Sequence, residues 1–586
     1  MAEIRNPQQE PGGEKKLLLI FALTFLMIVV GQTVFFKNRP QAPKPQDNQA
    51  QTAPSAAVAP AAAVAGPSGK AAAPAVAKQA QAETETIVEN NVSRIVFTNR
   101  GGQVKSWVLK QYRDEKGQPL ELVHQEAAKQ FGYPLSLYTY DQALTNKLNS
   151  GLYVASATGN LTTPGELTFE FSDGDLVAKK TFRFSDGYVV GVEANVARGG
   201  ANIAALPAWP SGFGDDTTPA SYSLQAVAHE SAGETDRLTG KKAVGGATLR
   251  GPFNWAGAQD QYFAALFLPD DPQAASLITL HGTMRIPEDL EKPDPNKTTP
   301  VDVIGAAVGD LNGPTVERVF VGPKALHILQ SVHTNTAPGQ LNGPDLSRVV
   351  DFGKYLGFIA KPLFLWLRWT HDHIVANWGW SIILLTVIIN LVLLPLRLSS
   401  MKSALKMQKI QPQMKALQEK YKKYKMNDPK RADMNTEMAA LYKQHGVNPV
   451  GGCLPLVIQM PFLIAFYGML AVAIELRQAH WYWLHDLSAP DKLYIIPVLI
   501  LISTITMQRM TPQAGMDPMQ AKMMTFMMPV FLGYISLRYA SGLGLYWIVG
   551  NVIGFIQQMI MNRTELGREI AAVRLKQANK RALKGK

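Results

Sequence analysis

Residues 448–470, NPVGGCLPLVIQMPFLIAFYGML, are apolar enough to cross a membrane but contain groups that a simple anchor would avoid. Pro455 and Pro461 each remove a helix hydrogen bond, and Gln459 between them places an amide near mid-membrane. Because polar groups cost free energy in lipid, we predict that this helix lines a hydrated recess open to lipid. A polar segment of another chain can be sheltered there while its apolar part stays in lipid. Such a recess would catalyse insertion of that chain into the membrane without covalent chemistry.

Other apolar segments also carry uncharged polar side chains. The interiors of the predicted spans contain no Asp, Glu, Lys or His, which argues against a proton- or sodium-coupled carrier. Each polar residue taken singly fits ordinary helix–helix packing, but amides on several spans favour a hydrated surface. These residues are Thr386, Asn390, Gln459, Tyr467, Ser503, Thr504, Thr506, Tyr546, Asn551, Gln557 and Gln558.

Signatures of an enzyme or a cofactor site are weak in this sequence. It has no phosphate-loop, HExxH or nucleophile-elbow motif. His371 and His373 would lie on different faces of a helix, so a polar rim is favoured over a metal site. GPSGK at 66–70 lacks the strand–helix context of a phosphate loop, and Cys453 is the only cysteine. We therefore expect no catalytic residue, no cofactor and no metal ion.

Residues 517–529, DPMQAKMMTFMMP, are rich in methionine. Flexible, polarizable side chains suit a surface that must accept many apolar partners. Ordinary lipid-facing or core filling is the alternative, and composition alone does not separate the two.

Six apolar segments are predicted to cross a bilayer. The first, 17–36, follows Lys15 and Lys16 and lacks a small-x-small cleavage site. We interpret it as an uncleaved signal anchor in preference to a cleaved signal peptide. The other five predicted spans are 377–397, 449–474, 492–509, 522–539 and 542–561.

Two basic blocks set the predicted orientation. Residues 399–447 contain 11 Lys/Arg and 4 Asp/Glu, and residues 563–586 contain 8 and 2. Basic loops stay in the cytoplasm, which also places residues 1–16 inside and residues 37–376 outside. Because the charge is confined to blocks that flank apolar runs, it indicates cytoplasmic loops, and we expect no DNA partner.

The predicted outer region, residues 37–376, contains two kinds of sequence. Residues 37–83 are rich in Ala, Pro and Gln and are predicted to be a tether. Residues 84–340 contain short alternating runs, such as SRIVFT, QVKSWVLKQY, LTFEFS and KKTFRFSDGYVVGVEANV, separated by turn signals. This pattern predicts one all-β domain, most simply a sandwich.

Two further helical segments are predicted outside the lipid interior. Residues 355–374 carry Lys361 and Arg368 on one helix face, with tryptophans beside the apolar side, which predicts a helix lying in the membrane interface. A seventh span is the alternative, and it would invert the later loops. Residues 398–447 repeat apolar positions at intervals of three and four, which predicts a hairpin of two antiparallel helices, and a basic tail follows at 562–586.

At these residues the chain resembles the YidC family of membrane protein insertases, in its Gram-negative form. The resemblance covers essentially the whole chain and implies a polytopic α-helical membrane protein of the bacterial inner membrane. It implies six TM helices with a five-helix insertase core, a groove open to cytoplasm and lipid, an all-β periplasmic supersandwich domain and cytoplasmic termini. The resemblance rests on NWGWSIILLTVIINLVLLPL at 377–396, ALYKQHGVNPVGGCLPLVIQMPF at 440–462, DPMQAKMMTFMMP at 517–529 and SGLGLYWIVGN at 541–551.

The same resemblance implies partners. Nascent membrane proteins would be the substrates, taken alone or with the Sec translocon, and membrane lipids would border the groove. The ribosome would be contacted through the cytoplasmic loops and the basic tail, although the tail also fits a topology signal alone. The candidate ribosome contacts are Lys580, Arg581, Lys584 and Lys586.

One residue departs from the family pattern. The family's groove carries an arginine on its first core span, and Asn390 occupies the matching position here. Arg397, seven residues on, would share that face and lie about 10 Å nearer the cytoplasm. The resemblance also places Thr386 opposite Trp547, where the family usually has tyrosine. The predicted groove residues are Thr386, Asn390, Arg397, Gln459, Tyr546 and Trp547, with Pro455 and Pro461 as span-breaking residues.

Two other functions compete with insertion. A polar groove open to lipid could also pass lipid headgroups, which would make the chain a lipid-moving protein. Alternatively, the β domain could recognise an envelope component while the spans serve as a platform.

Overall fold

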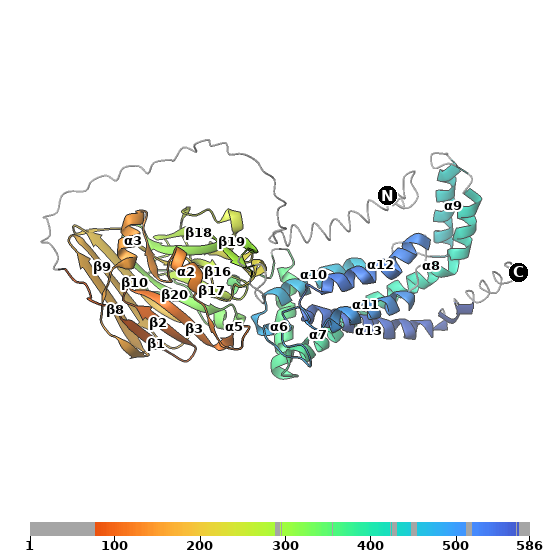
Figure 1. Ribbon diagram of the computed structural model, residues 1–586. Helices are drawn as coiled ribbons and strands as arrows, with labels where there is room; N and C mark the ends of the chain where they lie inside the picture. Colours follow the sequence, from red (N-terminus) through yellow and green to blue (C-terminus); the bar gives the residue numbers. More distant parts are fainter. Residues whose placement is uncertain are drawn as a thin grey trace. The chain divides into compact units, whose positions relative to one another are not determined.

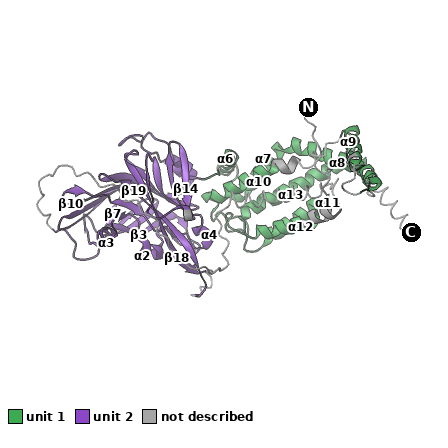
Figure 2. Cartoon of the chain, turned by 90° about the horizontal axis from the view of Figure 1, so that it is seen from above, with its two compact units in different colours: residues 1–35, 351–586 green, residues 36–350 purple. Residues whose placement is uncertain are grey.

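A computed structural model of the chain describes most residues from 77 onward. The described residues fall into two compact units, one ending at Val350 and one beginning at Asp351 (Figure 2). The predicted span at 17–36, most of the predicted tether and the four candidate ribosome contacts lie outside them. The described residues are 77–287, 294, 296–353, 355–421, 424, 430–446, 454–510, 518–565, 567–569 and 571–572.

The first unit is built from three β-sheets, as the alternating sequence predicts (Figure 1). Pairing is antiparallel except between β1 and β7. One five-stranded sheet contains β4 (Pro119–Glu121), β3 (Gln103–Arg113), β2 (Ser93–Thr98), β1 (Glu85–Glu89) and β7 (Gly159–Thr162). The other contains β15 (Thr248–Arg250), β18 (Ala275–Pro287), β19 (Thr298–Asp310), β12 (Leu206–Trp209) and β5 (Ser136–Tyr138).

The ten-stranded sheet joins the middle and the end of the domain sequence. It runs β14 (Glu234–Thr239), β13 (Ala226–Ser231), β16 (Trp255–Gln259), β17 (Phe263–Pro269), β20 (Thr315–Pro323), β10 (Val189–Arg198), β9 (Leu176–Phe184), β8 (Gly165–Asp173) and β6 (Val154–Ala155), with β11 (Ala201–Asn202) beside β10. Short helices α2 (Gln125–Phe131), α3 (Gln142–Ser150), α4 (Pro219–Tyr222) and α5 (Leu326–Gln330) connect strands. The prediction of an all-β sandwich is confirmed, including the strands read from the four quoted runs.

The core of this unit is aromatic. Phe97 lies 4.8 Å from Phe182 and 5.6 Å from Phe184, ring centre to ring centre. Trp107 and Trp209, from different sheets, are 6.0 Å apart, and both are almost completely buried. Aromatic side chains bury large apolar areas, so these contacts stabilise the sandwich.

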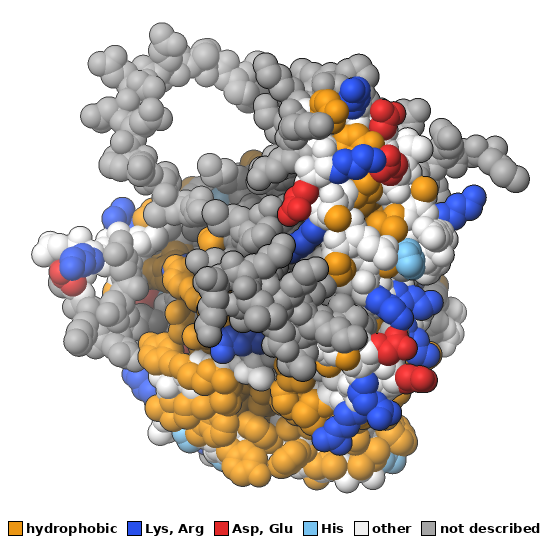
Figure 3. Space-filling model, turned by 90° about the vertical axis from the view of Figure 1, so that its right-hand side faces the viewer, with side chains coloured by type: hydrophobic (Ala, Val, Ile, Leu, Met, Phe, Trp, Pro, Cys, Tyr) orange, Lys and Arg blue, Asp and Glu red, His pale blue; other side chains and the backbone are white. Residues whose placement is uncertain are grey.

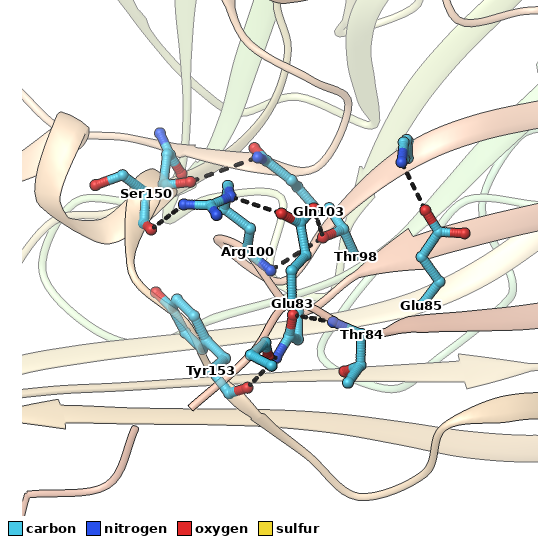
Figure 4. Close-up of polar contacts among 12 residues, drawn as sticks. Glu83, Thr84, Glu85, Thr98, Arg100, Gln103, Ser150 and Tyr153 are labelled. Carbon is cyan, nitrogen blue, oxygen red and sulfur yellow. Dashed lines mark hydrogen bonds and ion pairs between the residues drawn. The ribbon is translucent and has the colours of Figure 1, made fainter. Parts of the chain in front are cut away.

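The β unit begins earlier in the chain than the sequence predicts. Lys78 pairs with Ser172 as an isolated β-bridge, and Glu83 forms an ion pair with Arg100 at 3.0 Å and accepts a hydrogen bond from Thr98 at 2.9 Å (Figure 4). The predicted tether boundary at residue 83 is therefore wrong, because backbone pairing and these polar contacts attach residues 77–83 to the domain. The domain also continues beyond 340, to Val350.

Glu317 on β20 is a buried acidic residue whose carboxyl group has no hydrogen-bond partner among the described residues. The residue is 3% exposed, and neither carboxylate oxygen has a hydrogen-bond partner within the described structure. Burial raises the pKa of Glu317 well above its usual value. Burial thus favours the neutral form of this carboxyl group in the folded domain.

We expect Glu317→Gln to stabilise the domain at neutral pH. Because the pKa of Glu317 is higher in the folded than in the unfolded chain, the wild type is most stable below the unfolded-state pKa. It loses stability as the pH rises toward the folded-state pKa. Glutamine has no charge to bury, so the gain should be largest at pH 7 and should disappear as the pH falls to about 4. Thermal unfolding of the wild type and of Glu317→Gln between pH 4 and pH 7 measures this gain. A gain that does not change with pH would contradict the raised pKa of Glu317.

The second unit is helical. Its elements are α6 (Gly357–His373), α7 (Trp378–Val392), α8 (Leu394–Tyr421), α9 (Lys430–Gln444), α10 (Leu454–Val472), α11 (Ile495–Met510), α12 (Pro518–Ser536) and α13 (Ser541–Asn562). α11 packs between α12 and α13, and α13 packs on α7. α6 lies against both α7 and α10, as Figure 1 shows.

The helix lengths support only part of the predicted span count. Among the described residues, α13 alone is long and apolar enough to cross a membrane, and α7 with α8 passes as a pair although bent by 60°. The 16 residues of α11 reach about 24 Å, short of the roughly 30 Å hydrocarbon core. The count of six spans therefore stays a prediction.

Two packed helices occupy the region of the predicted hairpin, and the first begins earlier than predicted. Met407, Ile410 and Met414 on α8 form an apolar cluster with Met438 and Tyr442 on α9. α8 begins at Leu394, ahead of the predicted hairpin start at 398, because Pro395 suits the first turn of a new helix but not the interior of a continuing one.

Candidate functional site

A polar cluster joins three helices of the second unit. The Arg397 guanidinium on α8 donates a hydrogen bond from Nη2 to Oε1 of Gln459 on α10, at 2.8 Å. Tyr546 on α13 lies close enough to interact with both of these side chains. The cluster thus contains a cation, an amide and a phenol, the groups that can hold a polar or acidic segment of another chain.

The bend between α7 and α8 positions Arg397. The two helices meet at a 60° bend around Leu393, so Arg397 and Asn390 do not lie on one continuous helix. The predicted shared face of Asn390 and Arg397 assumed one continuous helix, and it stays a prediction. The bend instead presents Arg397 to Gln459, 62 residues away in sequence.

Aromatic packing holds Tyr546 in place. Its ring stacks on Phe466 of α10, with centres 4.4 Å apart and planes 25° apart, and Tyr546 is 5% exposed. Phe466 was not singled out by the sequence analysis. The available signal is its spacing: Phe466 follows Gln459 by seven residues, which places both on one face of a helix.

Thr386 and Asn390 lie inside the bundle and bond to their own helix. Thr386 is fully buried and donates to the Ile382 carbonyl oxygen at 2.7 Å, and Asn390 Nδ2 donates to the Thr386 carbonyl oxygen at 2.7 Å. Asn390 Oδ1 is buried without a partner among the described residues. These contacts make both residues part of the interior of α7, and they do not join them to the Arg397 cluster.

The remaining predicted groove residues have mixed outcomes. Trp547 is half-buried, and its predicted contact with Thr386 stays a prediction. Pro461 lies inside α10, which continues through it. The side chain of Pro455 lies outside the described residues.

A second polar contact ties α13 to α11. Asn551 Nδ2 donates to Ser503 Oγ and to Thr504 Oγ1, both at 3.0 Å. Gly544, two residues before Tyr546, packs directly against Ile496 of α11. These contacts set the position of α13 and therefore that of Tyr546.

The helical unit exposes apolar side chains on its surface. On α6, Phe358, Trp366 and Trp369 are between 51% and 75% exposed, as expected for a helix in the membrane interface. Viewed from the side that carries α9, the molecule shows hydrophobic side chains gathered over its lower part and scattered Lys and Arg above them (Figure 3).

The two histidines near the end of α6 have separate partners. His371 stacks on Trp378 with ring centres 3.9 Å apart, and His373 Nδ1 lies 3.1 Å from the Trp369 carbonyl oxygen. Across the described residues, no three His, Cys, Asp or Glu side chains are arranged to hold a metal ion.

Comparison with known proteins gives consistent matches over both units. Residues 85–366 match the YidC periplasmic domain family, and residues 369–568 match the 60Kd inner membrane protein family. The membrane protein insertase YidC of Syntrophus aciditrophicus is 32% identical, over 94% of this chain and 99% of its own. That of Cupriavidus necator is 33% identical, over 90% and 92%.

A crystal structure of an active YidC insertase also matches, at 19% identity over 83% of this chain and 94% of its own. Its TM-score of 0.33 is too low to support a structural argument. The sequence matches are sufficient, because relatives about one-third identical align over nearly their whole length. The chain belongs to the YidC family of inner-membrane protein insertases, and residues 85–366 are its periplasmic domain.

Proposed function

We propose that this insertase receives polar or acidic parts of nascent membrane proteins at the Arg397–Gln459–Tyr546 cluster. The hydrogen bond from Arg397 to Gln459 is the observation that carries the proposal. That bond uses one of the five N–H donors of a guanidinium, and a carboxylate can accept a further pair. A half-buried cation attracts an acid more strongly than one in water, because the surrounding dielectric is lower.

The topology we propose follows from charge. The predicted spans at 17–36, 377–397, 449–474, 492–509, 522–539 and 542–561 place both termini, the hairpin and the tail in the cytoplasm. The arginine cluster then lies toward the cytoplasmic end of the bundle, where an inserting segment arrives. The tethered β domain is placed in the periplasm, with α6 in the outer interface.

The proposed partners follow from the same arrangement. Nascent chains would arrive from the ribosome, contacted by the basic hairpin and by tail residues Lys580, Arg581, Lys584 and Lys586. The Sec translocon would pass longer substrates to the groove, and membrane lipids would border its open side. The groove needs no cofactor for this work, because sheltering polar groups is noncovalent.

The test is insertion of a two-span protein into vesicles containing the purified chain. One substrate carries two Asp residues in its translocated loop, and its matched control carries two Asn residues. We expect the chain to raise protease-protected insertion of both, and to raise that of the acidic substrate at least severalfold more. Transfer of a fluorescent lipid between leaflets is measured in parallel, and rapid lipid transfer without insertion would favour the lipid-moving alternative.

A further inference from the structure

The periplasmic domain contains an acidic pocket that the insertion mechanism does not use. It lies where the ends of β17 and β19 meet the starts of β18 and β20, and it has a volume of about 180 Å³. Its lining residues are Pro269, Asp270, Asp271, Ala274, Ala275, Gly309, Asp310, Pro314, Thr315, Val316 and Glu317. The pocket is thus lined by a connection from the ten-stranded sheet to a five-stranded sheet and by the connection that returns.

Every charged residue that lines this pocket is acidic. Asp270, Asp271, Asp310 and Glu317 contribute, and none of the described residues lining it is Lys or Arg. Asp270 Oδ1 accepts hydrogen bonds from Asn335 Nδ2 at 2.8 Å and from the Gly339 backbone N–H at 3.2 Å. These bonds fix the carboxylate in place. Arg318, which donates to Asn335 Oδ1 at 2.9 Å, interacts with Asp270 from outside the pocket lining and offsets part of its charge.

Two loop-end carboxylates are oriented in a similar way. Asp310 Oδ1 accepts from the Asn312 backbone N–H at 2.8 Å, and Asp271 Oδ1 accepts from the Gln273 backbone N–H at 3.0 Å. A carboxylate has two oxygens and about four acceptor positions, so these bonds leave capacity for a further donor. The pocket rim is therefore a set of acceptors held in place by its own backbone.

Glu317 supplies the independent observation. It is 97% buried, lines the pocket, and has no hydrogen-bond partner for either oxygen among the described residues. A buried carboxyl group left without a partner is costly, and a positively charged donor in the pocket would satisfy it. The acidic rim and the unpartnered glutamate therefore indicate the same kind of ligand, a positively charged hydrogen-bond donor.

The size of the pocket limits the ligand. Sites for drug-sized molecules occupy about 300–1,000 Å³, so this smaller pocket suits one flexible end group. We propose that the pocket binds a primary ammonium group at the end of an alkyl chain, from a free polyamine or from a lysine side chain of another protein. An ammonium group has three donors and no acceptor, which matches a lining of carboxylates.

The proposal is tested by isothermal titration of the purified full-length chain in detergent. The probes are cadaverine, N-acetyl-lysine methylamide, the uncharged N-acetyl-norleucine methylamide as matched control, and calcium chloride. We expect both ammonium probes to bind and the norleucine compound not to bind. Tighter binding of cadaverine would identify a free polyamine, and tighter binding of the lysine compound would identify a protein side chain.

Variants connect the binding to this pocket. Glu317→Gln and Asp310→Asn should each weaken ammonium binding at least tenfold, whereas Asp186→Asn, an exposed carboxylate on the β9–β10 turn, should not change it. Glu317→Gln is expected to melt at the same or a higher temperature, so weaker binding cannot be attributed to unfolding. Binding that survives both pocket variants, binding of calcium in place of the ammonium probes, or no binding at all would overturn the proposal.

Discussion

Replacing Arg397 with alanine is expected to reduce insertion of a substrate with an acidic translocated loop at least tenfold. Hydrogen bonds to charged groups contribute about 1.5–3 kcal/mol, and 1.4 kcal/mol corresponds to a factor of ten. Arg397 is half-buried and oriented by Gln459, so it is placed to make such bonds. The measurement is the protease-protected fraction in vesicles that contain equal amounts of each variant.

Three comparisons make this result specific. Asn390→Leu should keep most of the insertion activity, because Asn390 bonds within α7 and its Oδ1 has no partner in the described structure. The double variant should then behave like Arg397→Ala. Arg509→Ala, which removes an exposed cation from α11, is the matched charge control and should be close to wild type.

The neutral-loop substrate separates charge from folding. Arg397→Ala should affect it much less than the acidic-loop substrate, because it has no carboxylate to bind. Equal loss with both substrates would indicate a damaged bundle, and normal insertion of both would show that the arginine cluster is not the receiving site.

Gly544→Val is expected to disrupt the bundle and abolish most insertion of either substrate. A Cβ atom at residue 544 would overlap Cγ2 of Ile496 on α11, and the β-branched isoleucine has little rotamer freedom to move away. Forcing extra atoms into a packed contact costs about 1–3 kcal/mol. The displacement would also move Tyr546 and weaken the bonds from Asn551 to Ser503 and Thr504.

Gly550 provides a control on the same helix. A Cβ atom at this position meets nothing within 4 Å, so Gly550→Ala should insert normally and gain up to about 1 kcal/mol of helix stability. Thermal unfolding in detergent measures the stabilities, and the vesicle assay measures function. If Gly544→Val unfolds like wild type and still inserts both substrates, close packing of α11 on α13 is not required for the site.

The sequence predicted the elements well where the signal is local. Alternation along residues 167–172 and 179–196 predicted strands that the structure confirms. Spacing of three and four residues predicted the seam of α8 and α9. Boundaries were less accurate, because residues 77–83 have tether-like composition and join the domain through backbone pairing, which composition does not record.

Local pattern and motif therefore determined the element types, the all-β domain, the hairpin and the family of this chain. Tertiary structure alone decided which side chains meet. Arg397 reaches Gln459 because the chain bends near Leu393, and helical spacing along one segment cannot predict a contact made across that bend. Glu317 reads as an ordinary polar residue in a strand, and only the folded domain buries its carboxyl group beside three aspartates.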